Sequence, residues 1–198
     1  MNLSQPGATQ SAIRIPKQLY CSETGKPFSH CLVCNKYLLH DGISYMVEKS
    51  FRQIPEMNLR ESIFEYALCH SCSAMMNASL STESRERIDA YFQENTDLYG
   101  RSKKLLSAKT LRLKPWVEKC IVKGTPILKS REYQLVAECN GKNLIFTVMP
   151  FAISLEAIDE ITGLLSDKSL GEIDNFMGKY FTGPPEVSEI LKRRLVII

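Results

Sequence analysis

The sequence predicts an α+β protein, with an N-terminal module of turns, a β-hairpin and helices joined to a C-terminal unit of one hairpin and helices. Three observations support this prediction. Four of the seven cysteines form two Cys-x-x-Cys pairs, β-rich runs occur in both halves of the chain, and apolar residues at helical spacing follow these runs. The 198 residues are 44% hydrophobic and 24% charged, as in ordinary globular proteins.

The composition divides the chain into four segments. Residues 1–18 are largely polar and are predicted to be disordered. Residues 19–100 contain five of the seven cysteines and all three histidines, and they form the predicted cysteine-rich module. Residues 101–119 form a basic connector, and residues 120–198 form the hairpin and helix domain. No internal repeat is visible in the sequence.

The cysteine-rich module contains two predicted strands. Residues 43–51 and 63–68 mix β-branched and aromatic residues with polar ones, which favours two short strands. The segment 53–61 between them contains Pro55 and Asn58 and is predicted to be a loop.

Two helices are predicted after the second cysteine pair. Met75, Met76 and Leu80 fit a first helix. Ser81 is a suitable N-cap for a second helix, with Glu83 favourably placed in its first turn. The apolar face of this second helix is formed by Ile88, Tyr91 and Phe92.

The C-terminal unit begins with a predicted hairpin. Asn140 and Gly141 lie between two β-rich runs, residues 132–139 and 143–149, in which apolar residues alternate. Asn-Gly is a strong hairpin signal because both residues tolerate a positive φ.

Two amphipathic helices are predicted after this hairpin. Apolar residues recur at helical spacing over residues 155–165 and, more strongly, over residues 173–181. Ser169 and Glu172 fit a capping box that would start the second of these helices. The chain ends in the apolar run LVII, which we expect to dock on the rest of the protein.

The two Cys-x-x-Cys pairs predict a zinc site. Cys31 and Cys34 are separated from Cys69 and Cys72 by 34 residues. Zinc prefers four tetrahedral ligands, and each Cys-x-x-Cys turn can direct two thiolates at one ion. Because four thiolates leave no position open for water, the expected role of a single Zn²⁺ is structural. The alternatives are a thioredoxin-like redox pair, which needs one such motif in a βαβ context, and four unrelated cysteines.

The order of knuckle, hairpin, second knuckle and helix resembles the treble-clef class of zinc modules, with zinc ribbons as the nearest relatives. The resemblance covers residues 28–95 and depends on the four cysteines and the helix after them. It implies that Cys69 and Cys72 lie at the N-terminus of a helix. The class includes binding modules, nucleases and ribosomal proteins, so it does not determine a function.

Other candidate residues lie near these cysteines in the sequence. Cys21 is a possible spare ligand, although a partly buried free thiol is the expected role. His30 and His70 adjoin the zinc ligands and could replace one of them, but we expect them beside the site or on the surface. His40 and Asp41 resemble the metal-polarising pair of HNH nucleases, although a turn before the strand is the expected role because the rest of that pattern is missing.

Positive charge is concentrated in the middle of the chain. The formal net charge is −2 for residues 1–100, +8 for residues 101–150 and −3 for residues 151–198, which gives +3 overall. The basic connector is therefore a candidate nucleic-acid interface, with Trp116 available for stacking on a base. The alternative, which we favour, is that the connector is a solvated linker that pairs with the acidic last segment. The candidate nucleic-acid-binding residues are Arg101, Lys103, Lys104, Lys109, Arg112 and Lys114.

The sequence favours binding over catalysis. Residues 120–198 contain no histidine, glycine-rich phosphate loop or nucleophile elbow. The apolar runs fall well short of the roughly 18 residues that span a bilayer, and the N-terminus lacks the pattern of a signal peptide. We therefore expect a cytoplasmic binding or adaptor protein that contacts a protein partner or itself. The alternatives are a nucleic-acid-binding regulator that uses the connector and the zinc module, and a metal-dependent HNH-like nuclease.

Overall fold

The computed structural model describes residues 11–54 and 59–181. Within this part, the strands form a single antiparallel sheet with the order β1-β5-β4-β2-β3, and β6 also pairs with β4. The strands are β1 (Ser11–Arg14), β2 (Ser44–Ile54), β3 (Leu59–Cys69), β4 (Glu132–Asn140), β5 (Asn143–Phe146) and β6 (Phe151–Ser154). The α-helices are α1 (His70–Ser79), α2 (Thr82–Asn95), α3 (Leu98–Ser107), α4 (Leu113–Val117), α5 (Leu155–Gly163) and α6 (Asp167–Tyr180). The predicted α+β class is confirmed.

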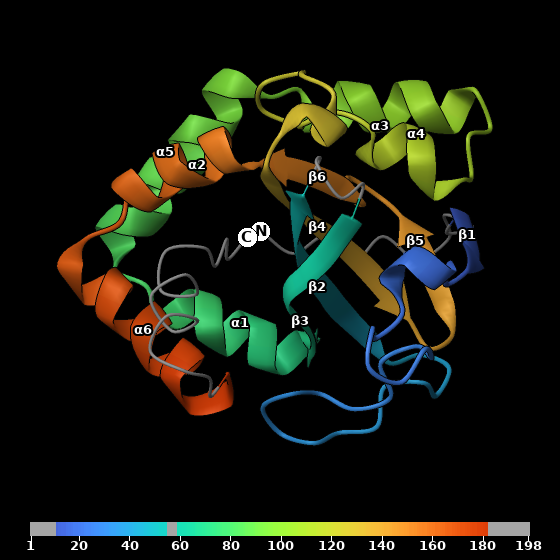
Figure 1. Ribbon diagram of the computed structural model, residues 1–198, viewed down its shortest axis with the longest axis horizontal. Coiled ribbons are helices and arrows are strands. Elements are labelled where there is room, and N and C mark those ends of the chain that lie inside the picture. Colours follow the sequence, from blue (N-terminus) through green and yellow to red (C-terminus); the bar gives the residue numbers. More distant parts are fainter. Residues whose placement is uncertain (1–10, 55–58, 182–198) are drawn as a thin grey trace.

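The helices are divided between two regions around the sheet. Helices α1, α2, α5 and α6 lie on one side, where α2 runs beside α5 and α6 runs beside α1 (Figure 1). Helices α3 and α4 lie together at another edge of the molecule (Figure 1). Short 3-10 helices, η1 (Lys17–Leu19) and η3 (Ile127–Lys129), complete the described elements. Within the described residues, no helix combines the length and apolarity needed to cross a bilayer.

Strands β2 and β3 are longer than the sequence predicts, and charged residues pair across the sheet both in the predicted part and, at Arg52, in the extension. Lys49 lies opposite Glu65 with Nζ 2.8 Å from a carboxylate oxygen. Arg52 lies opposite Glu61 on one neighbouring strand and opposite Glu132 on the other, with its Nε 2.9 Å from Glu132. Lys49 and Arg52 therefore each have an opposite charge directly across the sheet, which stabilises the pairing of these strands.

The cysteine-rich module and the C-terminal unit share this sheet. Strand β2 pairs with β4 over nine residues, from Ser44 opposite Asn140 to Arg52 opposite Glu132. Residues 19–100 and 120–198, which the sequence predicts to be separate units, therefore both contribute strands to this sheet.

Residues 11–18 are ordered, whereas the sequence predicts disorder there. Strand β1 pairs with β5 from Ser11 opposite Phe146 to Arg14 opposite Asn143, and Ile15 is buried. The polar neighbours of these residues concealed a short strand that covers the edge of the sheet. The rest of the predicted disordered segment, the loop residues 55–58 and the terminal LVII run lie outside the described residues.

The hairpin predicted at Asn140 and Gly141 is confirmed, one residue later than expected. Asn140 pairs with Asn143, so Gly141 and Lys142 form the turn. Gly141 has φ of +52°, and an added Cβ would lie 2.9 Å from the carbonyl oxygen of His40. This position therefore requires glycine for both its backbone conformation and its space.

Two apolar cores lie beside the sheet, and each receives a helix from the other half of the chain. The first core includes Leu38, Phe64, Tyr66, Cys69 and Cys72. The second core includes Cys120, Phe151, Ile153, Ala157 and Ile161. Helix α6 contributes Ile173 and Met177 to the first core, whereas α2 contributes Ile88 and Phe92 to the second. Each half of the chain therefore contributes one helix to the core of the other half.

A cluster of four serines connects the N-termini of α2 and α6. Ser81 caps α2 by accepting from the N–H of Ser84, and Ser166 caps α6 by accepting from the N–H of Ser169. Each cap is completed by the other helix: the N–H of Ser81 donates to Ser169 Oγ and that of Ser166 donates to Ser84 Oγ, both at 2.9 Å. The predicted start of α6 at Ser169 is therefore wrong by three residues, because the partner of the cap lies on another helix and not at Glu172.

Removing a hydroxyl from the serine cluster should destabilise the protein. In Ser84→Ala, the N–H of Ser166 loses its acceptor in a position where Ser84 is fully buried. We expect a loss of about 1–3 kcal/mol in the free energy of unfolding, measured by urea denaturation. Ser107→Ala, at an exposed position at the end of α3, is the matched control and should change stability by less than about 0.5 kcal/mol. Equal effects of the two substitutions would contradict the role of the cluster.

Candidate metal centre

Four cysteines lie close together in a cluster, as the sequence predicts. The Sγ atoms of Cys31, Cys34, Cys69 and Cys72 all lie within 4.8 Å of one another. Cys34 Sγ and Cys69 Sγ are 3.7 Å apart. A tetrahedron with metal–sulfur bonds of about 2.3 Å has edges of about 3.8 Å, so the spacing suits one zinc ion. No disulfide joins these cysteines, which are all free thiols.

The first two candidate ligands lie in a tight turn, residues 31–36. The N–H of Cys31 donates to Lys36 O and the N–H of Asn35 donates to Cys31 O, both at 2.9 Å. Asn35 has φ of +58°, a conformation that asparagine tolerates better than most residues. The turn is attached to the sheet because the N–H of Leu32 donates to Ala67 O of β3 at 2.9 Å. Cys31 is buried and Cys34 is exposed at the rim.

The other two candidate ligands lie at the start of α1. Cys69 is the last residue of β3 and the N-cap of α1, and Cys72 is in the first turn of the helix. The backbone N–H of Cys69 donates to Cys31 Sγ at 3.4 Å. The positive end of the helix dipole favours negative charge on sulfur at this position. The predicted placement of these two cysteines at a helix N-terminus is therefore confirmed.

Burial and neighbouring groups shift the pKa values of Cys31, Cys69 and Cys72. Burial raises the pKa of Cys31, but the N–H groups of Cys34, Cys69 and Val33 act against it and lower the pKa to about 7. Burial and the neighbouring thiols raise the pKa of Cys72, and burial raises that of Cys69. One thiolate therefore disfavours ionisation of the next, and a divalent cation between the sulfurs removes this repulsion.

The other cysteine and the histidines of this segment lie outside the cluster. Within the described ranges, only the four cysteines form a group with the geometry of a metal site. His30 is exposed and its Nδ1 lies 2.9 Å from Ser29 Oγ, while His70 is exposed in the first turn of α1. His40 is exposed in the loop before β2, where its ring packs against Tyr37 at 4.8 Å. Cys21 is partly buried, as expected for a free thiol.

The candidate nucleic-acid-binding residues differ in their environments. Arg101 is used internally: its guanidinium lies 5.0 Å from the ring of Trp116 and donates to the carbonyls of Trp116 and Pro150. Burial lowers its pKa to about 10. Trp116 is 1% exposed, so it is not available for stacking on a base, contrary to the expectation. The remaining candidates, Lys103, Lys104, Lys109, Arg112 and Lys114, are exposed.

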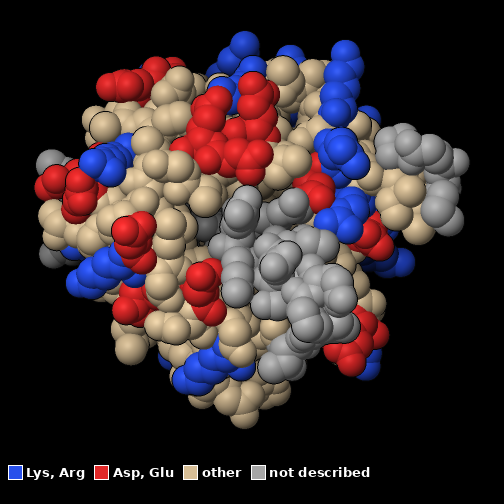
Figure 2. Space-filling view, turned by 60° about the vertical axis from the view of Figure 1, so that its left-hand side comes forward, with Lys and Arg blue, Asp and Glu red and all other residues tan. Residues whose placement is uncertain are grey.

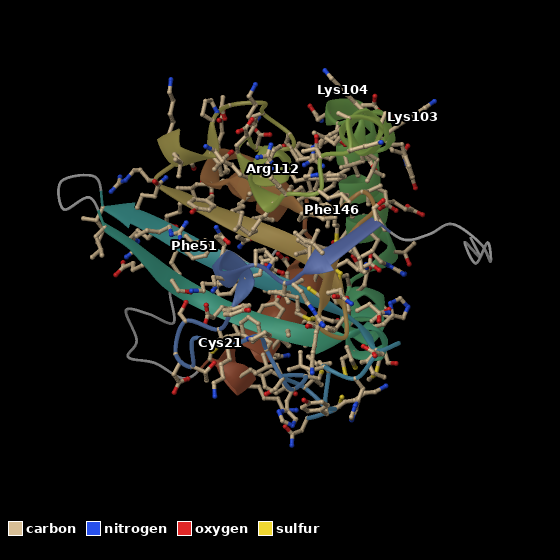
Figure 3. All side chains as sticks on the ribbon, turned by 90° about the vertical axis from the view of Figure 1, so that its right-hand side faces the viewer. Cys21, Phe51, Lys103, Lys104, Arg112 and Phe146 are labelled. Atoms are coloured by element: carbon tan, nitrogen blue, oxygen red, sulfur yellow. The ribbon has the colours of Figure 1, made fainter. Side chains whose placement is uncertain are left out.

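These exposed bases lie on two helices and the turn between them. Figure 3 shows Lys103 and Lys104 extending outward from α3, with Arg112 on a different part of this region. On the face that carries α2 and α5, acidic side chains form a contiguous group among scattered basic ones (Figure 2). Lys123 pairs with Glu160 of α5 at 2.5 Å. A single continuous basic field is thus absent from the face shown in Figure 2.

An apolar groove is a feature that the sequence did not indicate. It has a volume of about 520 Å³, and Leu128 at its edge is 70% exposed. The apolar residues come from three separate segments of the chain, so no local pattern marks them. The groove is lined by Leu113, Val117, Pro126, Ile127, Leu128, Tyr133 and Leu135, with Gln18, Arg60, Lys114, Glu118 and Lys119 as its polar residues.

Comparison with models of known protein families, with curated proteins and with solved structures finds no match to this chain. The candidate site is therefore interpreted from its own geometry.

Proposed function

We propose that the chain is a cytoplasmic adaptor protein whose treble-clef-like module is held by one structural Zn²⁺, and that it binds a protein partner without catalysis. The observation that carries the metal assignment is the close group of four cysteine sulfurs, in which three of the four residues are buried. With four thiolates bound, zinc has no position for water or substrate. All seven cysteines are free thiols, which fits a reducing compartment.

The chain order around the metal supports a treble-clef-like arrangement. The turn at Cys31 precedes the β2–β3 hairpin, and β3 leads directly into α1 with Cys69 as its N-cap. The two ligand pairs thus come from a turn and a helix start on either side of a hairpin. Such an arrangement supplies folding energy through the metal and leaves the outer surfaces for binding.

The apolar groove is the surface that best suits a protein partner. Its walls are aliphatic and aromatic, whereas Arg60, Lys114 and Lys119 at its margin are opposed by one acid, Glu118. A partner segment with apolar side chains flanked by carboxylates would complement both features. We therefore assign the groove to an acidic, apolar peptide segment of another protein.

The two alternatives have less support. Nucleic-acid binding retains five exposed bases but loses Arg101 and the stacking residue Trp116. A nuclease centred on His40 would need nearby metal ligands, and the described residues group no carboxylates or histidines with it. These alternatives are distinguished by what binds at each surface.

A photo-crosslinking amino acid in the groove tests the proposed partner site. It is placed at Leu128 and, as a matched control, at Met75, because both side chains are 70% exposed. After irradiation in the cells that naturally contain the protein, position 128 should give a discrete protein adduct that survives nuclease treatment, and position 75 should not. Charge reversal by Lys114→Glu and Lys119→Glu should reduce this adduct about tenfold.

Two results would count against this assignment. Equal adducts at positions 128 and 75 would show that the groove has no specific partner. Nuclease-sensitive adducts at Lys103 or Lys104, together with salt-dependent retention on nucleic acid, would favour the nucleic-acid alternative.

A further inference from the structure

The turn that begins at Cys120 has the hydrogen bonds of the metal-binding turn at Cys31. In both, the first N–H donates to the carbonyl five residues later, and the fifth N–H donates to the first carbonyl, all at 2.9 Å. The fifth residue has a positive φ in both, +58° at Asn35 and +66° at Gly124. Cys21 starts a third turn of this form, so the turn alone does not identify a metal site.

The turns at Cys31 and Cys120 are also attached to the sheet in the same way. The second residue of each turn donates its N–H to an alanine two residues before the end of a strand. Leu32 donates to Ala67 of β3 at 2.9 Å, and Ile121 donates to Ala152 of β6 at 2.8 Å. The short bridges that flank the two turns match as well, since each joins the residue before the cysteine to the residue six positions after it.

The strand that follows this alanine ends at a helix N-cap in both places. Cys69 is the N-cap of α1, and its N–H donates to Cys31 Sγ at 3.4 Å. Ser154 is the N-cap of α5, and its N–H donates to Cys120 Sγ at 3.3 Å. In both places, the sulfur of the cysteine that begins the turn accepts a hydrogen bond from the N-cap residue of a helix.

The sheet has the symmetry that this correspondence requires. Tyr45 lies opposite Cys69, and Tyr133 lies opposite Ser154, so the two N-cap residues share one register. The nine-residue pairing of β2 with β4 is centred on Glu48 opposite Val136. A two-fold rotation about that pair exchanges β2 with β4 and places β3 on β5 and β6 together.

The second helix of each half follows the same rotation. Helices α2 and α6 each have 14 residues, and their N-caps, Ser81 and Ser166, each lie twelve residues after the preceding N-cap. The reciprocal serine cluster and the exchanged helices of the two cores are what a two-fold axis between α2 and α6 produces.

We propose that residues 29–95 and 118–180 are two copies of one metal-binding unit, and that the second copy retains a latent site for a thiolate-preferring cation such as Zn²⁺. In the second copy, three of the four ligand positions no longer carry sulfur. The positions of Cys31, Cys34, Cys69 and Cys72 correspond in turn to Cys120, Lys123, Ser154 and Ala157.

Hydrogen bonds and packing take the place of a metal in this second copy. Ser154 Oγ donates to Cys120 Sγ at 3.2 Å, in addition to the backbone N–H groups of Ser154 and Lys123. The side chain of Lys123 pairs with Glu160. Ala157 is fully buried in the second core at the position where the first copy has Cys72. The natural chain should therefore bind one metal ion and not two.

Restoring the three missing sulfurs tests the latent site. The triple variant Lys123→Cys, Ser154→Cys and Ala157→Cys is titrated with Co²⁺ alone and compared with the natural full-length chain. We expect one additional equivalent of Co²⁺ per chain, with the charge-transfer absorption of a tetrahedral thiolate site. A control with three cysteines at the exposed positions Ser107, Lys168 and Lys179 should add none at comparable affinity.

The double variant Lys123→Cys and Ser154→Cys leaves the buried Ala157 unchanged and provides three sulfurs, so it decides the question if the triple variant does not fold. A folded variant that binds no more Co²⁺ than the natural chain would overturn the proposal. The second site is inferred from its correspondence to the proposed zinc centre, and a different result would overturn each of them. A natural chain without metal would overturn that centre, whereas the difference of one equivalent tests the second site.

Discussion

Cys72→Ser should release the metal and unfold the N-terminal part of the sheet. The substitution removes one of the four proposed ligands, and Cys72 itself is buried in the first core together with Cys31 and Cys69. Structural zinc supplies about 10–16 kcal/mol of apparent binding free energy in small zinc modules, so losing a ligand removes much of the stability of this region. Elemental analysis should find about one zinc per natural chain and less than about a tenth of that in the variant.

Cys21→Ser is the matched control for this experiment. Cys21 is a partly buried free thiol outside the cluster, so this variant should keep its zinc and its thermal unfolding profile. Cys34→Ser, like Cys72→Ser, should lose its zinc. A natural chain purified without metal under non-chelating conditions, or a Cys72→Ser variant that keeps its full complement, would refute the structural-zinc assignment.

Lys49→Met should cost about 3–5 kcal/mol in the free energy of unfolding, because it leaves the Glu65 carboxylate without its opposite charge. Lys49 is 3% exposed and Glu65 is 14% exposed, and Nζ of Lys49 lies 2.8 Å from Glu65. Lys49 also donates to the carbonyl of Tyr20 and ties the N-terminal turn to the sheet. Urea denaturation at pH 7 measures the loss.

The pH dependence of this loss identifies its cause. Burial raises the pKa of Glu65, but Lys49 and Ser22 more than offset it, so the pKa lies below its usual value. A lowered pKa contributes stability at neutral pH that disappears as pH falls through the acid range. The natural chain and Lys49→Met should therefore differ most near pH 7 and converge at acid pH. A difference that is independent of pH would indicate lost packing alone.

Two further variants complete the comparison. Arg87→Met breaks an ion pair with Glu83 in which both side chains are more than half exposed, and it should cost less than about 1 kcal/mol. Lys49→Met combined with Glu65→Leu removes both buried charges together and should recover most of the stability.

The four-cysteine cluster could be predicted from the sequence because the signal for each half of it is local. Each Cys-x-x-Cys pair lies within four residues, and the change from β-forming to helix-forming residues after Cys69 places the second pair at a helix start. The cap of α2 at Ser81 was predictable for the same reason. These features depend on neighbours in the chain, which a sequence shows directly.

The features that were not predicted correctly depend on residues far apart in the chain. The end of β2 at Arg52 was not predicted as strand, because its partner Glu132 lies about eighty residues away in the sequence. The start of α6 was misplaced because the partner of Ser166 is Ser84. The repeat was invisible because it is carried by backbone hydrogen bonds, while three of four ligand positions in the second copy have changed residue type.

Because α2 and α6 each pack in the core of the other half, the two halves should stay associated when the chain between them is cut. Proteolytic cleavage near the exposed Asp97 would give two fragments. These fragments would remain bound through the pairing of β2 with β4 and through the packing of α2 and α6 in the opposite cores. Such a nicked protein would travel as a single particle on a sizing column and would separate only when denatured. The chain therefore has the construction of an intertwined dimer whose two subunits have been fused end to end.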